Sequence, residues 1–516
     1  GGCGQTTAGS SRRPGRRRLQ GMPPGAEIRE VTDAASLAAA PPRPDKDIAD
    51  FVISVMFLTA SVMVGSFLSL INSKNQELRA FTWAMLESGM AIFVAVMISE
   101  AGKDTLLLLT KPKGIGVDVA NVVYAILCSI AAQVATHRLV SITGTMGRGL
   151  KRKIVYTRAL MGVIARFQAF AWLGFWARLQ IWVSKLCSYG PLIPVLAAVQ
   201  MCLLTSVFEW VRLRYVNQDG EVNDGEVEWM QLTLKNEIEA TGMCISYCFC
   251  QWVRFWVGGK MPDPGGVEYA ATDAVNHAAF EHEWSDIGLL FLVAVLFRVL
   301  GDVVNVQSGK WVACVRGDAC KRALERILMI FVNTCLKECG WLLLFTVMWI
   351  IGKIRLVEAK HMGEEKKLST DCVQARAITA IACTYFSFLV IVILGKVQVS
   401  WTGFIKTGTL QSLIVTVGFS WRRWFGLCID TVTIYLGPKI SRYFCSSDKD
   451  CSRDGEFILE IAISIFMAVA LIPSLLHQVT PSAILMSEAT VHEERRSRST
   501  LAGGGLELAV RPVATV

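Results

Sequence analysis

The chain has 516 residues, of which 53% are hydrophobic and only 18% are charged, whereas soluble domains carry about 25% charged residues. Its net charge of +9 comes largely from the tails and a few loops, which favours contact with anionic lipid headgroups over nucleic-acid binding. This composition excludes an ordinary soluble protein and indicates one that lies mostly in a lipid bilayer.

The chain divides into three regions by composition. Residues 1–50 are predicted to form a basic and largely disordered N-terminal tail, with five arginines and no acidic residue in the first 26 positions. Residues 51–477 hold the long apolar segments of a transmembrane helical bundle. Residues 478–516 are predicted to form a disordered cytoplasmic tail that contains Arg495, Arg496 and Arg498. Both basic tails are candidate contacts for anionic lipid.

Eleven apolar segments follow one another in the central region, each about 17 to 27 residues long. As helices that rise 1.5 Å per residue, they are long enough to cross a hydrocarbon core of about 30 Å. They are Phe51–Ile71, Phe81–Ile98, Ile115–Ala135, Ala159–Val183, Leu192–Val211, Ile238–Val257, Ile287–Val306, Ile327–Ile351, Ile378–Leu394, Leu410–Leu436 and Phe457–Leu476. Because lipid offers no hydrogen-bond partners to the backbone, we predict an all-α, polytopic transmembrane helix bundle of about ten or eleven spans. Residues 287–351 and 378–436 are candidate repeat units.

The distribution of lysine and arginine among the loops predicts the orientation. The basic loop at 138–158 is placed in the cytoplasm, so the acidic segment 258–286 falls outside and the basic loop at 310–322 falls inside. Two basic segments conflict with this arrangement, because residues 353–367 and the N-terminal tail fall outside. A re-entrant or interfacial second or fourth segment would return the tail to the inside.

Two cysteines share a polar segment on the predicted outer side. Cys445 and Cys451 lie within residues 437–456, close to the Gly437-Pro438 turn. In an oxidising compartment we expect them to form a disulfide, with two free thiols as the alternative. Most of the remaining cysteines lie inside apolar segments, where cysteine acts as a small hydrophobic residue.

The acidic outer segment contains one candidate metal site. Asp273, His277 and Glu281 follow at intervals of four residues, so a short helix would place all three on one side. Carboxylate and imidazole ligands suit zinc or another divalent metal. A solvated amphipathic helix without a ligand is the alternative interpretation.

Nucleotide-binding and hydrolase motifs are missing from the sequence. It has no G-x-x-x-x-G-K-[ST], no H-E-x-x-H and no G-x-S-x-G, which argues against an ATP-driven pump and against the commonest routes to a membrane hydrolase. We therefore expect no cofactor and name no catalytic residue.

Thr416–Ser420 reads T-V-G-F-S and resembles part of the selectivity filter of potassium channels. The resemblance covers five residues, and Ser420 stands where the filter needs its second glycine. The cationic pair Arg422 and Arg423 follows directly. We interpret the segment as ordinary helix in which Gly418 permits close packing.

Charged residues near the middle of the apolar segments are the most informative feature, because an ionised group in the bilayer is costly and is seldom kept without use. They are Glu87, Arg298, Lys337, Glu338, Arg422 and Arg423. Arg298 has Asp302 one helical turn away and is predicted to pair with it locally. We predict that Glu87, Lys337, Glu338 and one or both of Arg422 and Arg423 meet in one buried cluster.

These features favour a secondary transporter or a channel-like protein that moves an unknown ion or small polar solute past the intramembrane charges. The alternative is a non-transporting scaffold or receptor in which the same charges only determine how the helices pack. An intramembrane enzyme is the third class.

Overall fold

The computed structural model describes residues 67–110, 115–145, 150–186, 192–216, 224–262, 282–362, 373–396, 402–444 and 449–486, together with single positions between 54 and 65. Within these ranges all regular structure is helical and no strand occurs, which confirms the all-α prediction. The described helices belong to one compact unit, Pro44–Val516. The sites predicted at Asp273, His277 and Glu281 and at Cys445 and Cys451 lie outside the described side chains.

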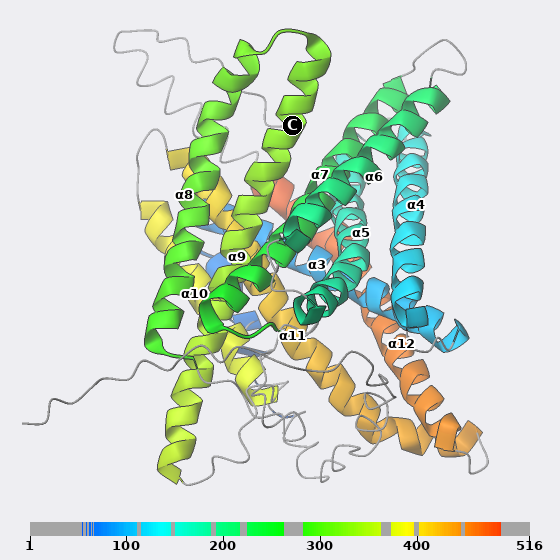
Figure 1. The fold of residues 1–516 in the computed structure, drawn as a ribbon, viewed down its shortest axis with the longest axis vertical. Coiled ribbons are helices and arrows are strands. Elements are labelled where there is room, and N and C mark those ends of the chain that lie inside the picture. Colours follow the sequence, from blue (N-terminus) through cyan, green and yellow to red (C-terminus); the bar gives the residue numbers. More distant parts are fainter. Residues whose placement is uncertain are drawn as a thin grey trace, which may run out of the picture. The chain divides into compact units, whose positions relative to one another are not determined.

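Ten long α-helices and one π-helical turn make up the described bundle (Figure 1). They are α3 (Gln76–Thr110), α4 (Ile115–Thr145), α5 (Leu150–Leu186), α6 (Leu192–Val216), α7 (Asp224–Gly258), α8 (Trp284–Cys314), α9 (Asp318–Met362), α10 (Val373–Lys396), α11 (Thr402–Phe444), α12 (Lys449–Ser474) and the π-helix η2 (Leu475–Val479).

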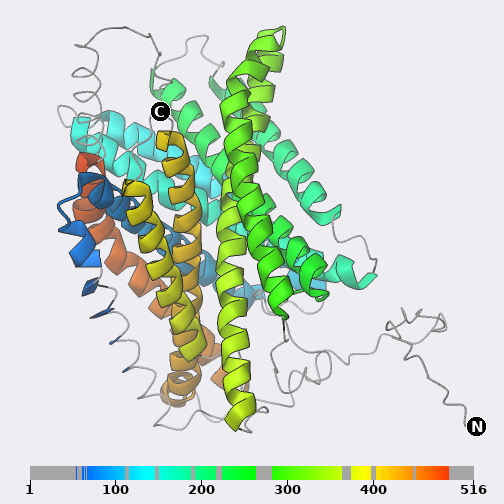
Figure 2. The same ribbon diagram turned by 90° about the vertical axis from the view of Figure 1, so that its left-hand side faces the viewer.

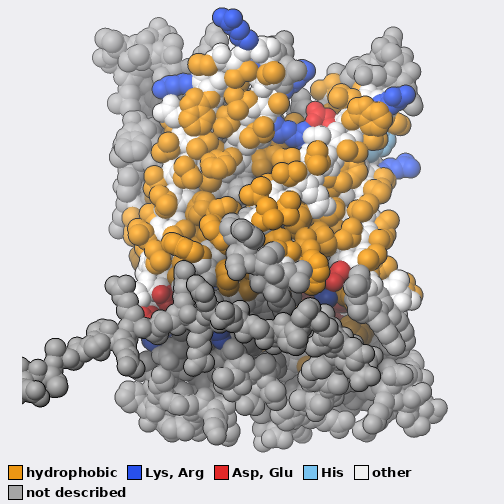
Figure 3. Space-filling view, in the orientation of Figure 1, with side chains coloured by type: hydrophobic (Ala, Val, Ile, Leu, Met, Phe, Trp, Pro, Cys, Tyr) orange, Lys and Arg blue, Asp and Glu red, His pale blue; other side chains and the backbone are white. Residues whose placement is uncertain are grey.

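Eight of these helices are long and apolar enough to cross a membrane, namely α3, α4, α5, α6, α8, α9, α10 and the helix at Phe457–Met486. Their outward faces carry exposed apolar side chains, as in Val119, Val123, Leu127, Ile130 and Val134 of α4. Figure 3 shows such side chains over the middle of the described helices. Soluble monomers do not expose apolar surfaces of this extent, so the protein is a multi-pass integral membrane protein.

The prediction of ten or eleven spans is higher than the eight helices that meet this criterion among the described residues. The predicted segments 238–257 and 410–436 are helical, as parts of α7 and α11. Charged residues within both helices lower their mean hydropathy. Both helices also contribute buried side chains to the main apolar core of the bundle. The first predicted segment, 51–71, is described only at single positions in its first half.

The fourth predicted segment is not an interfacial helix. It belongs to α5, which packs against α3, α4 and α7. Ala165, Ala169 and Trp172 of α5 are buried, and the indole of Trp172 donates a hydrogen bond to Ser129 on α4 at 2.9 Å. Arg166, near the middle of α5, likewise points between helices and pairs with Glu239 on α7.

Helices α7 and α9 lie at the centre and run in the same direction. Asn333 near the start of α9 donates to the backbone oxygen of Ile238 at 3.1 Å. Farther along both helices, the guanidinium of Arg254 lies 3.6 Å from the ring centre of Phe345. Helix α8 makes this parallel arrangement possible because it returns the chain before a tight turn at Gly317, whose φ of +90° favours glycine. Figures 1 and 2 show α8 and α9 as the resulting hairpin.

Helix α9 also makes a close contact with α11. The hydroxyls of Ser412 and Thr416 donate to the backbone oxygens of Leu336 at 2.7 Å and Gly340 at 2.9 Å. A Cβ at Gly340 would lie only 2.4 Å from the backbone oxygen of Ser412, so glycine is what permits this approach. Residues 416–420 are continuous helix, which confirms the helical interpretation of the T-V-G-F-S segment.

The last described helix extends beyond the predicted end of the bundle at residue 477. Pro473 interrupts the hydrogen bonding of α12, and the π-helical turn η2 follows at once. The helix then continues to Met486. Val479, Thr480 and Ala483 of this extension are buried, so they pack with the rest of the bundle.

Replacing Gly340 with alanine should weaken the bundle by about 1 to 3 kcal/mol, the usual cost of overpacking a core. The loss is measured as the difference in the free energy of unfolding between variant and wild-type protein in mixed detergent micelles. Gly426→Ala on α11 is the matched control, because no atom lies within 4 Å of a Cβ there. The control should be neutral or slightly more stable, since alanine favours helix. Equal stability of the two variants would contradict the close approach of α9 and α11.

Cysteine labelling should report the orientation of the α8–α9 turn. Cys314 and Cys320 flank this turn and are exposed, whereas Cys244 and Cys248 are buried. With the turn in the cytoplasm, a membrane-impermeant maleimide should modify Cys314 and Cys320 only after permeabilisation, as mapped by peptide mass spectrometry. Modification in intact cells would reverse the predicted orientation. The two buried thiols should react only after unfolding.

Candidate functional site: a polar seam between α7 and α9

Three of the residues predicted to form one cluster bind residues outside it. Arg158 on α5 donates to Glu87 at 2.7 Å, and Arg422 on α11 forms an ion pair with Glu100 on α3. The ammonium group of Lys337 donates to the backbone oxygen of Glu239 at 2.7 Å. The direct partners of these three charges therefore lie at the α3–α5, α3–α11 and α7–α9 contacts, and the meeting of all the predicted residues in one cluster stays a prediction.

The predicted local pair is present. Arg298 and Asp302 form an ion pair one turn apart on α8, which confirms that prediction. The same guanidinium donates to the hydroxyl of Thr409 on α11 at 3.2 Å and lies against Gly408. This pair thus joins α8 to α11, in keeping with a packing role.

A deeply buried ion pair joins α6 to α7. Arg212 donates to both carboxylate oxygens of Glu237, at 2.5 and 3.0 Å. Their side chains are only 5% and 0% exposed. A bidentate guanidinium–carboxylate pair is the arrangement that best offsets the loss of hydration on both charges.

This pair is the centre of a network that connects four helices. Gln133 on α4 donates to Glu237 at 3.0 Å and accepts from Arg212 at 3.0 Å. Arg326 on α9 forms an ion pair with Glu209 on α6 and a second with Glu237 at 3.4 Å. Two acids and two arginines balance each other, so the network as a whole carries no formal charge.

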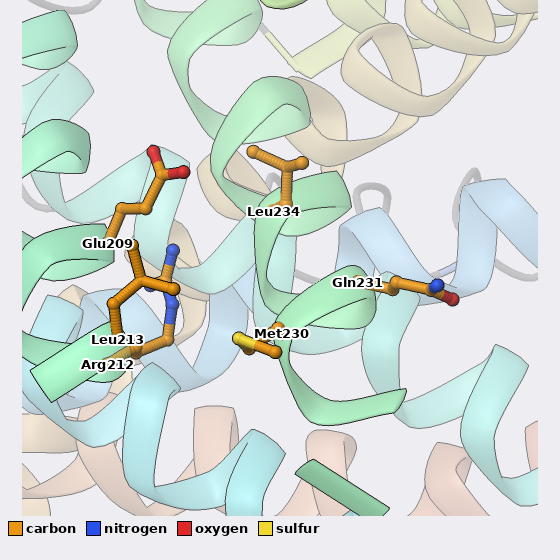
Figure 4. Close-up of a pocket in the computed structure, with 6 residues that line it drawn as sticks. All are labelled: Glu209, Arg212, Leu213, Met230, Gln231 and Leu234. Atoms are coloured by element: carbon orange, nitrogen blue, oxygen red, sulfur yellow. The ribbon is translucent and has the colours of Figure 1, made fainter. Parts of the chain in front are cut away.

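A small pocket lies beside the network, between α6 and α7 (Figure 4). It has a volume of about 130 Å³, room for several water molecules or a small solute. Its lining consists of Glu209, Arg212 and Leu213 from α6 and Met230, Gln231 and Leu234 from α7. The pocket thus brings a half-exposed carboxylate, Glu209, to the edge of the buried ion network.

Farther along α7 and α9 a second set of charges meets. Glu239 pairs with Arg166 of α5 at 3.5 Å, and its backbone oxygen holds Lys337. Arg166 also donates to the backbone oxygen of Gly162 at 3.0 Å. The carboxylate of Glu239 thus faces the three cations Arg166, Lys337 and Lys235.

A third polar group lies near the other ends of the two helices. Arg254 is fully buried and donates to Gln251 at 2.9 Å, whose amide in turn donates to Tyr247 at 2.7 Å. The guanidinium of Arg254 stacks on the ring of Phe345, and Arg423 approaches the same ring to 5.6 Å. These contacts hold a cation within the core by hydrogen bonds and by its attraction to the aromatic ring.

These three groups and Glu338 form what we call the polar seam: Glu237, Glu239 and Arg254 of α7 with Arg326, Lys337 and Glu338 of α9. Glu237 and Arg254 lie 17 residues apart on α7, about 26 Å at 1.5 Å per residue. That length is close to the thickness of a hydrocarbon core. The seam therefore places polar groups at successive positions along α7 and α9.

Two seam residues, Glu237 and Arg326, and their partner Arg212 were missed in the sequence because the predicted spans were ended at charged residues. Arg212, Glu237 and Arg326 each lie immediately outside a predicted apolar segment. The helices continue through all three. Arg166 and Arg254 lay inside predicted spans, and their charge was the signal that could have identified them.

The network predicts unequal costs for two substitutions on α7. Glu237→Gln leaves a buried arginine without its carboxylate and should destabilise the protein by about 3 to 5 kcal/mol. Glu228→Gln is the matched control, because its pair with Lys153 at 2.6 Å is 33% and 26% exposed and should contribute about 0 to 1 kcal/mol. The free energies of unfolding of the two variants in detergent micelles measure both costs. Equal costs would contradict the burial of Glu237.

No protein-family model matches the sequence, and no curated protein or solved structure matches it. Among the described residues, no group of three His, Cys, Asp or Glu side chains is arranged to hold a metal ion. Function has to be inferred from the chemistry of the polar seam.

Proposed function

We propose that the protein is a secondary transporter or a channel-like protein that moves a small ion or polar solute along the polar seam. The observation that carries the proposal is the position of Arg326 between two carboxylates, Glu209 beside the pocket and Glu237 in the core. A cation shared by two acids on different helices has two alternative partners. Such an exchange is a local event that can couple solute entry to helix movement.

The depth of the seam supports the same proposal. Charged groups inside a membrane line substrate or ion pathways in most proteins that keep them. Here the polar groups extend over about 26 Å of α7, with the α6–α7 pocket near one end. A solute that enters this pocket meets Glu209 first and the Arg212–Glu237 pair behind it.

A non-transporting scaffold or receptor is the second candidate, and one observation favours it. Several ion pairs join neighbouring helices far from the seam, such as Lys406 with Glu77 at 2.9 Å and Arg178 with Asp118 at 2.9 Å. Pairs of this kind specify which helices pack together without moving any solute. In that case the seam charges would have the same structural role.

Flux in proteoliposomes separates the two candidates. Purified protein would be tested with a panel of labelled inorganic ions, organic acids, amino acids and sugars, and we expect saturable movement of at least one class. Arg326→Gln should lower that rate about ten- to hundredfold, since a charge-assisted hydrogen bond contributes about 1.5 to 3 kcal/mol. Arg178→Gln, which removes a half-exposed cation on α5, is the control and should transport normally.

Two results would contradict the transport proposal. One is no protein-dependent flux of any panel member by wild-type protein of native thermal stability, which would favour the scaffold. The other is normal flux by folded Arg326→Gln protein, which would show that the network only stabilises the helices. Thermal midpoints and size-exclusion profiles establish in each case that the variant is folded.

A further inference from the structure

Glu338 differs from the other buried acids of the seam region in having no charged partner. It lies near the middle of α9 and is fully buried. Neither of its carboxylate oxygens forms a hydrogen bond with any described group. Glu237 and Glu87, by contrast, each accept a hydrogen bond from an arginine on a neighbouring helix.

Buried cysteines of α7 and α9 lie around Glu338. From α7 it faces the thiol of Cys248 and the backbone of Cys250. From its own helix it faces the thiols of Cys335 and Cys339. Every thiol of this set is buried and free.

Two cations of this region, Lys337 and Arg298, have partners elsewhere. Lys337 lies on a different side of α9 and donates to the backbone oxygen of Glu239. Arg298, beyond Cys339, is paired with Asp302. An ionised carboxylate at Glu338 would thus be buried without a counter-charge, which is strongly unfavourable, whereas the neutral acid carries no such cost.

We propose that Glu338 is a proton-binding site, a carboxylic acid that carries a proton at neutral pH inside the polar seam. A proton fits better than a metal cation, because the surrounding thiols are not the oxygen ligands that alkali and alkaline-earth ions require. The residue lies between the Arg326 network and the Arg254 group along α9. Its role in coupling a proton to solute movement rests on the proposed function, but its protonation does not.

Infrared spectroscopy of the reconstituted protein tests the protonation directly. At neutral pH, wild-type protein should show the C=O stretching band of a protonated carboxylic acid, and uniform carbon-13 labelling of glutamate should shift part of it. Glu338→Gln should lose the intensity of one carboxylic acid. Glu228→Gln, which removes an ion-paired carboxylate of α7, is the control and should keep the full band.

Thermal stability gives a second readout that does not depend on the spectrum. Glutamine has nearly the shape and charge of a protonated glutamic acid, so Glu338→Gln should fold with a midpoint close to that of wild-type protein. Loss of folding in Glu338→Gln, with Glu228→Gln unaffected, would show that an ionised group is needed and would overturn the proposal. The absence of a glutamic-acid band in wild-type protein, or an undiminished band in Glu338→Gln, would overturn it as well.

The same measurements keep this proposal separate from the transport proposal. If Glu338 is protonated but the protein transports none of the tested solutes, the proton site stands and its proposed role in coupling is wrong. If the protein transports a solute but Glu338 is not protonated, the transport proposal stands and the proton-site proposal is wrong. If both hold, a pH gradient should accelerate solute uptake by wild-type protein and have no effect on Glu338→Gln.

Discussion

A charge that leaves water for the interior of a membrane bundle needs a partner there, and in this bundle the requirement is met chiefly along α7. The bidentate pair of Glu237 with Arg212 attaches α7 to α6, and the contacts of Gln133 and Arg326 add α4 and α9. Loss of hydration would make each of these groups unfavourable alone. Together they determine which helices can be neighbours and at what depth each one lies.

Apolar packing holds the same helices together alongside the ion pairs. One large cluster of buried side chains includes residues from α3, α5, α7, α8, α9, α10, α11 and α12, and a smaller one includes residues from α4, α5, α6 and α7. Helices α5 and α7 contribute to both. Because lipid provides little hydrophobic drive between helices, close contacts such as that at Gly340 and polar contacts such as Arg212–Glu237 carry much of the specificity.

The apolar lengths in the sequence were sufficient to predict the helical class, since the backbone has no other way to satisfy its hydrogen bonds in lipid. The pairing of Arg298 with Asp302 was also predictable, because the two residues lie one turn apart on one helix. Partners on other helices were not predictable in this way. Glu87 binds Arg158, 71 residues away in the chain, and no local pattern distinguishes that arginine from its neighbours. Charged residues at the end of a predicted span, such as Glu237, were assigned to loops because the spans were drawn from runs of apolar residues alone.

The hydroxyls of Ser412 and Thr416 bind the backbone of α9 at Leu336 and Gly340, on either side of Glu338 in the chain. Contacts of this kind depend on register, so they resist any sliding of α9 along α11. Asn333 and Lys337 of α9 bind the backbone of α7 at Ile238 and Glu239 in the same way. Helices α7, α9 and α11 are therefore held in a fixed register and resist sliding past one another as one unit.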